Sequence, residues 1–81
     1  MAVFEIKDGV CIIPSGVTEI PDGAFEECTS LQIIEIPNGV RKIGFDAFRG
    51  CSNLKEIIIP SSVEEICKDA FEGCNAIIKR L

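Results

Sequence analysis

The sequence has no histidine, tryptophan or tyrosine, and its only aromatic side chains are five phenylalanines. Without histidine, a nucleophilic serine or cysteine would need a carboxylate or a lysine as its base. A zinc site would need closely spaced cysteine pairs, which the sequence also lacks. The glycines form no phosphate-binding loop such as G-x-G-x-x-G. We therefore expect no enzymatic activity, no catalytic residue, no cofactor and no metal site.

Basic residues are also scarce, with 8 Lys and Arg against 13 Asp and Glu and a net charge of -5. Nucleic-acid binding needs a basic surface that neutralises phosphates, so nucleic acid is not an expected partner, and an acidic membrane surface is disfavoured for the same reason. No apolar run approaches the roughly 20 residues that span a bilayer. The first residues show no basic segment followed by an apolar one, as a secretion signal would. The localisation stays open: cytoplasmic, or surface-exposed if the chain is excised from a longer exported protein.

What the sequence does contain is an internal repeat with a period of 23 residues. It divides the middle of the chain into residues 9–31, 32–54 and 55–77. A fixed period of this size indicates a solenoid, in which each unit is one coil that cannot bury its apolar face alone. Seven columns hold a single residue type in all three units: Ile13/Ile36/Ile59, Pro14/Pro37/Pro60, Val17/Val40/Val63, Ile20/Ile43/Ile66, Ala24/Ala47/Ala70, Phe25/Phe48/Phe71 and Cys28/Cys51/Cys74.

Each unit predicts the same succession of local structures. Residues 54–59 (LKEIII) are rich in β-branched side chains and stop at a proline, as strands do, and alternation sends Ile57 and Ile59 to the inner face. A polar corner and a Val-x-x-Ile segment follow. The Asp-Ala-Phe-x-Gly-Cys stretch fits a single helical or 3₁₀ turn, with Phe and Cys on the inner side.

The combined pattern, L-x-x-I-x-I-P-x-x-V-x-x-I-x-x-x-A-F-x-x-C, resembles the BspA-like, or treponemal-type, leucine-rich repeat over residues 9–77. The resemblance implies an α/β solenoid: a right-handed coil with a parallel β-sheet on one side and short helical or 3₁₀ turns on the other. It also implies a non-enzymatic protein, usually at the cell surface, that binds other proteins. The family's proteins are commonly longer and many are exported, so the chain could also be a fragment of a longer surface adhesin.

A β-hairpin is expected to cap the first coil. Asp8-Gly9 between alternating apolar positions is typical of a two-residue type I′ turn. In that register Lys7 faces Val10, Ile6 faces Cys11 and Phe4 faces Ile13. The 81 residues then form a single leucine-rich-repeat domain. Its parts are the capping hairpin at 1–13, the three repeats at 9–31, 32–54 and 55–77, and a terminal strand at 78–81.

The C-terminal edge is the less protected one. At the 23-residue offset Arg80 takes the place of Ile57 and Lys79 that of Glu56, and such charges commonly blunt an exposed sheet edge. Two hypotheses remain open: a frayed segment with solvated charges, or an edge that pairs with a second copy or with further repeats, which makes the chain a structural unit that oligomerises. The self-association edge comprises Ile77, Ile78, Lys79, Arg80 and Leu81.

The outward face of the main sheet is the expected contact surface for a partner protein, whose identity the sequence does not give. Alternation places Val10/Ile33/Glu56 in one outward column and Ile12/Glu35/Ile58 in the other. Four of these six positions are aliphatic, which indicates an interaction site or, alternatively, only a preference for strand-forming residues. The candidate partner-binding residues are Val10, Ile12, Ile33, Glu35, Glu56 and Ile58.

Five cysteines invite a disulfide interpretation. Those of the repeated column, Cys28, Cys51 and Cys74, should point the same way and act as buried free thiols, and Cys11 should do the same. Cys67 lies at a corner that we expect to be more exposed, so it is the candidate for intermolecular oxidation. Charged columns should place a base between two acids, as in Glu19/Lys42/Glu65 and Glu26/Arg49/Glu72, with Glu56 over Lys79.

Overall fold

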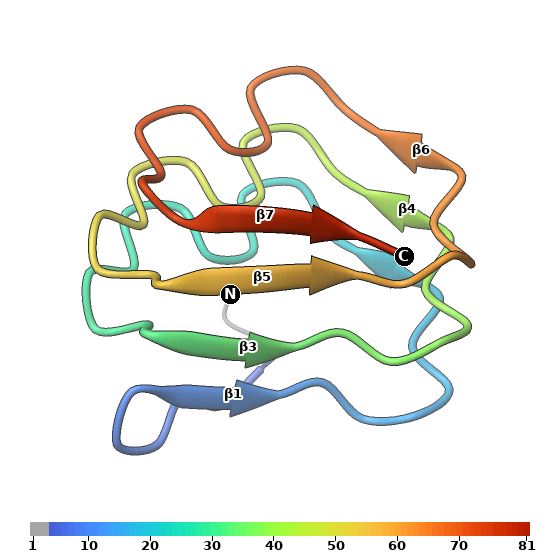
Figure 1. The fold of residues 1–81 in the computed structure, drawn as a ribbon, viewed down its shortest axis with the longest axis horizontal. Coiled ribbons are helices and arrows are strands. Elements are labelled where there is room, and N and C mark those ends of the chain that lie inside the picture. Colours follow the sequence, from blue (N-terminus) through green and yellow to red (C-terminus); the bar gives the residue numbers. More distant parts are fainter. Residues whose placement is uncertain (1–3) are drawn as a thin grey trace.

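The computed structural model describes residues 4–81, so residues 1–3 of the expected capping hairpin lie outside the described residues. The described chain winds through stacked coils that carry strands on two sides (Figure 1). The strands are β1 (Val10–Ile12), β2 (Glu19–Ile20), β3 (Ile33–Glu35), β4 (Lys42–Ile43), β5 (Glu56–Ile59), β6 (Glu65–Ile66) and β7 (Ile77–Arg80).

The strands form two parallel sheets, because each coil passes through the same two positions. One sheet has the order β1-β3-β5-β7 and the other the order β2-β4-β6. Val10 pairs with Ile33 and Ile33 with Glu56, and in the second sheet Glu19 pairs with Lys42. Each of these pairs is one 23-residue repeat apart. The parallel-sheet solenoid predicted from the repeat is therefore confirmed.

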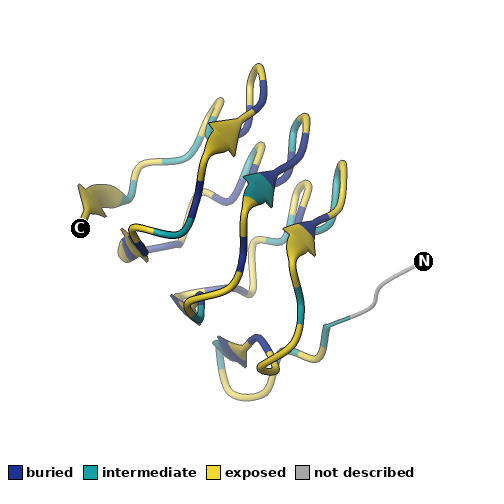
Figure 2. Cartoon of the chain, turned by 90° about the vertical axis from the view of Figure 1, so that its right-hand side faces the viewer, coloured by how far each residue is buried: buried dark blue, intermediate teal, exposed yellow. Residues whose placement is uncertain are grey.

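The core is a set of stacked columns between the two sheets (Figure 2). Ile20 and Ile43 are fully buried, as are most members of the other inward columns. The phenylalanine column is continuous: ring centroids are 5.2 Å apart for Phe25 and Phe48 and 5.5 Å for Phe48 and Phe71, with nearly parallel planes. Each coil thus buries its apolar residues against the same residues of the next coil.

The expected helical or 3₁₀ turns, and with them the α part of the α/β class, are not confirmed, since residues 4–81 contain no helix. The segment around Phe25 is instead a succession of turns. The Ala24 N–H donates to the Pro21 carbonyl at 3.1 Å, but the Phe25 N–H donates to Ala47 of the next coil at 2.8 Å. Glu27 also adopts a positive φ of 59°. Alternate N–H groups therefore bond between coils, and left-handed residues interrupt any helix.

At the N-terminus, Asp8 and Gly9 both have positive φ, 52° and 82°, as a type I′ turn requires. The Lys7 N–H donates to the Val10 carbonyl and the Val10 N–H donates back, each at 2.9 Å. This is the one antiparallel pair within residues 4–81, so the expected pairing of Ile6 with Cys11 and of Phe4 with Ile13 is absent there. Phe4 stacks instead on Phe25, with centroids 5.6 Å apart.

At the C-terminus the expected register is wrong by two residues. Ile78 pairs with Ile57 and Arg80 with Ile59, an offset of 21 and not 23 residues. A shift of two keeps every side chain on its face of the sheet. It brings an isoleucine over Ile57, where the 23-residue offset would have placed a guanidinium group. The apolar match therefore sets this register, and the last corner is shorter.

Candidate functional site

The outward face of the four-stranded sheet carries the candidate partner-binding residues in two columns. All six predicted positions share this face, because the register between β1, β3 and β5 follows the repeat. The 21-residue offset of β7 adds two residues that the sequence did not place there, Ile77 beside Glu56 and Lys79 beside Ile58. The full columns read Val10-Ile33-Glu56-Ile77 and Ile12-Glu35-Ile58-Lys79.

Four isoleucines form a zigzag across this face, which we call the isoleucine stripe: Ile12, Ile33, Ile58 and Ile77. Each lies on a neighbouring strand and one step of two residues along the face from the next, a separation that long side chains can cover. Their side chains are 44 to 65% exposed. The residues between them on the same strands, Cys11 and Ile57 among them, are fully buried. The strands therefore alternate strictly, yet apolar side chains occupy both of their faces.

Two carboxylates interrupt the stripe and differ in their partners. Glu56 is paired with Lys79, whose Nζ lies 3.0 Å from Glu56 Oε2. This is the contact expected from the repeat, although the two residues are diagonal and not directly opposite. Glu35, which is exposed in the middle of the sheet, forms no ion pair within residues 4–81. Its carboxylate is free to accept hydrogen bonds or to pair with a cation.

The face is not flat. A hollow of about 380 Å³ lies between β3 and β5. Its lining combines stripe residues with both carboxylates: Ile33, Ile34, Glu35, Lys55, Glu56 and Ile58. A site of this kind, apolar with a few converging polar groups, can receive a side chain of a bound protein.

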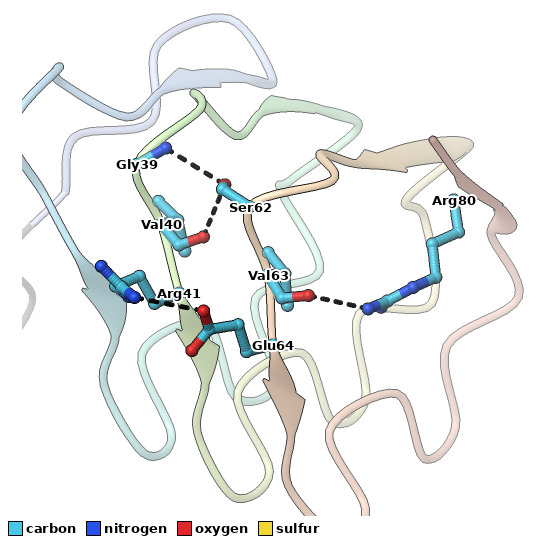
Figure 3. Close-up of polar contacts among 7 residues, drawn as sticks. All are labelled: Gly39, Val40, Arg41, Ser62, Val63, Glu64 and Arg80. Atoms are coloured by element: carbon cyan, nitrogen blue, oxygen red, sulfur yellow. Dashed lines mark hydrogen bonds and ion pairs between the residues drawn. The ribbon is translucent and has the colours of Figure 1, made fainter.

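The predicted self-association edge is exposed throughout, since every residue of β7 and Leu81 is open to solvent. Arg80 is nevertheless ordered by a contact inside the chain. Its Nη2 donates to the carbonyl of Val63 at 2.7 Å across the end of the solenoid (Figure 3). One coil earlier, Ser62 Oγ donates to the carbonyl of Val40, also at 2.7 Å. Arg80 thus supplies to the last coil a hydrogen bond that a neighbouring coil supplies elsewhere.

The cysteines are all free thiols. Cys11 and Cys51 are buried, whereas Cys28 and Cys74 are half-buried. Burial raises the pKa of the Cys51 thiol to about 12, and burial raises the pKa of Cys28 as well. These thiols therefore stay protonated and are weak nucleophiles at neutral pH.

The expectation that Cys67 is exposed is wrong. Its side chain is buried and its Sγ lies 3.8 Å from Glu65 Oε2. Burial, and then the nearby Glu65 carboxylate, raise the pKa of this thiol. Both effects disfavour the thiolate that oxidation requires. Across residues 4–81, no group of three His, Cys, Asp or Glu side chains is arranged to hold a metal ion.

The charged residues of the smaller sheet stabilise neighbouring coils. Arg41 Nη2 lies 3.1 Å from Glu64 Oε2 of the next coil (Figure 3). Arg49 lies 3.7 Å from Asp46 and 4.0 Å from Asp69, in place of the expected contacts with Glu26 and Glu72. These pairs are exposed, so each contributes on the order of 0.5 kcal/mol. They do not converge on a site.

Comparison with known proteins gives one match. The family model described as a BspA type leucine rich repeat region, in 6 copies, matches residues 9–79. No curated protein and no solved structure shows significant similarity to the chain. Among the described residues there is also no helix with the length and apolarity to cross a membrane.

Proposed function

Because this chain belongs to the BspA-type leucine-rich repeat family, we propose that it is a non-enzymatic interaction module that binds another protein through the outward face of its four-stranded sheet. The family as a whole supports a role in protein interaction, and it is generally a binding scaffold without catalysis. The position of the binding face, the residues on it and a location at the cell surface, as part of a longer adhesin, are proposals.

The observation that carries the proposal is the exposure of the isoleucine stripe. Burying an apolar side chain contributes about 25 cal/mol for each Å² removed from water, so four adjacent half-exposed isoleucines are a large unused driving force. Single exposed apolar residues are ordinary on a protein surface, but a contiguous group on a flat sheet is typical of an interaction site.

The sheet also offers a rigid frame for binding. Its backbone is held by hydrogen bonds on both sides in β3 and β5, so little conformational entropy is lost when a partner docks there. Glu35 and the hollow beside it add polar selectivity. A partner that fits this face presents aliphatic or aromatic side chains to Ile33 and Ile58 and a cationic or N–H group to Glu35.

The proposal can be tested without knowing the natural partner. Peptides are selected against the immobilised chain from a random display library, and the bound face is then mapped by backbone amide chemical-shift changes. We expect the changes to centre on β3 and β5. The double variant Ile33→Lys, Ile58→Lys should lose binding by at least about tenfold, because it places two charges on the stripe.

The matched control is Phe45→Lys, which adds a charge at an equally exposed apolar residue outside the four-stranded sheet. This variant should bind the selected peptides as well as the unmodified chain does. If the shifts centre elsewhere, or if Phe45→Lys and the double variant weaken binding alike, the sheet face is not the binding site.

A further inference from the structure

The two ends of the solenoid differ in how completely their apolar columns are covered. At the C-terminal end, Ile66 is 39% exposed and Ile78 is 45% exposed. Their counterparts one coil earlier, Ile43 and Ile57, are both fully buried. Phe71 and Cys74 show the same change, because Phe48 and Cys51 in the preceding coil are buried and they are not. Residues of core positions thus form an open apolar end surface (Figure 2).

The N-terminal end lacks such a surface within residues 4–81. Ile20 and Phe25 of the first coil are already buried, since Phe4 stacks on Phe25 and the Asp8-Gly9 turn folds the chain back. Stacking of one copy's C-terminal end on another copy's N-terminal end would have to displace this segment. The surface that matches an open C-terminal end is therefore the C-terminal end of a second copy.

The edge of β7 supplies directional contacts beside this surface. The Ile77 N–H donates to the Lys55 carbonyl and the Leu81 N–H donates to the Ile59 carbonyl, each at 3.0 Å. Successive peptide groups of a strand point to opposite sides, so the backbone N–H and C=O of Ile78 and Arg80 face away from β5. β7 is the outer strand of its sheet, and nothing in residues 4–81 pairs with these groups.

We propose that two copies of this chain associate through their C-terminal ends, with β7 paired antiparallel to β7 of the second copy about a two-fold axis at Ile78. Ile78 then lies opposite its own equivalent, Arg80 lies opposite Ala76, and Ile77 lies opposite Lys79. This register engages the edge-facing peptide groups of all three residues, 76, 78 and 80, on both strands. The two sheets become one continuous sheet, and the open columns of the two copies face each other.

Other registers are less favourable on this edge. Opposite residues of an antiparallel pair point to the same face, so only registers that match outward with outward residues are allowed. Centring the pair on Lys79 or Arg80 would place like charges opposite each other, which is destabilising. Centring it on Ile77 leaves the peptide group of Arg80 without a partner from residue 76. The contact between Arg80 and Val63 keeps that guanidinium group on its own chain.

The association is tested on the full chain by sedimentation equilibrium over a range of concentrations. We expect a monomer–dimer equilibrium with no larger species, because a two-fold contact closes on itself. Ile78→Lys should shift the chain to the monomer, while Ile12→Lys, at an exposed position on the far strand β1, should leave the dimer intact. Circular dichroism would show that both variants are folded.

A second pair of variants decides the register and does not depend on the core. Ile77 is outward and exposed, and the proposed register places it opposite Lys79 of the second copy. Ile77→Glu should therefore strengthen the dimer, and Ile77→Lys should weaken it, with dissociation constants about tenfold apart. Within one chain the order is reversed, because residue 77 lies beside Glu56.

A wild-type chain that stays monomeric throughout, an open-ended oligomer, or equal association of the two Ile77 variants would each overturn the proposal. The outcome is independent of the proposed partner face. A failed dimer leaves peptide binding at Ile33 and Ile58 unaffected, and failed peptide selection leaves the β7 contact unaffected.

Discussion

Arg80 and Val63 are joined by a hydrogen bond of 2.7 Å from the guanidinium Nη2 to the backbone carbonyl, across the open end of the last coil. The arginine occupies the column of Ile59, so its charged head lies over the end of an apolar core. Its stem covers part of that core while its head satisfies a carbonyl, which is the way that long cationic side chains commonly close apolar surfaces.

Removing this contact should destabilise the fold. Arg80→Ala leaves the partly buried carbonyl of Val63 without its donor and uncovers the end of the core, so we expect a loss of about 1 to 2 kcal/mol in the free energy of unfolding. Urea denaturation measures it. The control is Arg41→Ala, which removes an exposed ion pair with Glu64 and should cost less than about 1 kcal/mol. Equal losses would mean that the Arg80 contact has no special role.

The phenylalanine column predicts a gradient of stability along the solenoid. Phe48 is fully buried between the rings of Phe25 and Phe71, so Phe48→Ala should cost about 3 to 5 kcal/mol and unfold much of the population at room temperature. Phe71→Ala should cost less, because Phe71 is only partly buried at the open end. Thermal denaturation followed by circular dichroism compares the two. A larger loss at Phe71 would contradict the packing described for this end.

The Cys51 thiol makes the stability depend on alkaline pH. Burial raises its pKa from 9.0 to about 12, so the folded chain holds this proton where the unfolded chain has lost it. The stabilising contribution is complete below pH 9.0 and is lost as the pH rises toward 12. We therefore expect the urea midpoint to fall over this interval. Cys51→Ala should start from a lower midpoint but fall less steeply, and parallel curves for the two chains would argue against the shift.

Much of this structure could be predicted from the repeat alone. Columns such as Val40/Val63 and Ile20/Ile43 are buried as expected, because residues one period apart meet the same environment. The register of β7 could not be predicted in this way. The repeat imposes 23 residues, but the match of Ile78 to Ile57 outweighs it where no further coil holds the corner at its usual length.

The turns were the other limit of the sequence. Gly50 and Gly73 have positive φ, and so do Asp46 and Asp69 four residues before them. Asp in this region is tolerated and not required, so it gives a weak signal against a helix. For the candidate site, the alternation placed six residues correctly on one face. The seventh and eighth, Ile77 and Lys79, needed the true register of β7.

The closest approach between coils lies at Gly44, and it yields the last prediction. A Cβ built at Gly44 would collide with Asp22 of the preceding coil, at the carboxylate oxygen Oδ1, at the backbone N (2.6 Å) and at Cα (2.9 Å). The φ of Gly44 is not in the left-handed region, so the obstacle is space and not backbone strain. Gly44→Ala should therefore destabilise the chain by about 1 to 3 kcal/mol, as overpacking does, in urea denaturation.

A double-mutant cycle identifies which atoms obstruct the alanine. Asp22→Ala removes the carboxylate, together with its 2.9 Å hydrogen bond from the Phe45 N–H, but leaves the backbone N and Cα in place. Asp22→Ala should thus not rescue Gly44→Ala, and the two losses should add within about 0.5 kcal/mol. Since the backbone separation of the coils is fixed by bonds such as Gly44 N–H to Ile20 carbonyl at 2.9 Å, glycine is the residue that lets the two coils pack at this distance. A clear rescue would instead make the side chain of Asp22 the obstacle, and the coils would then have room to accept a methyl group.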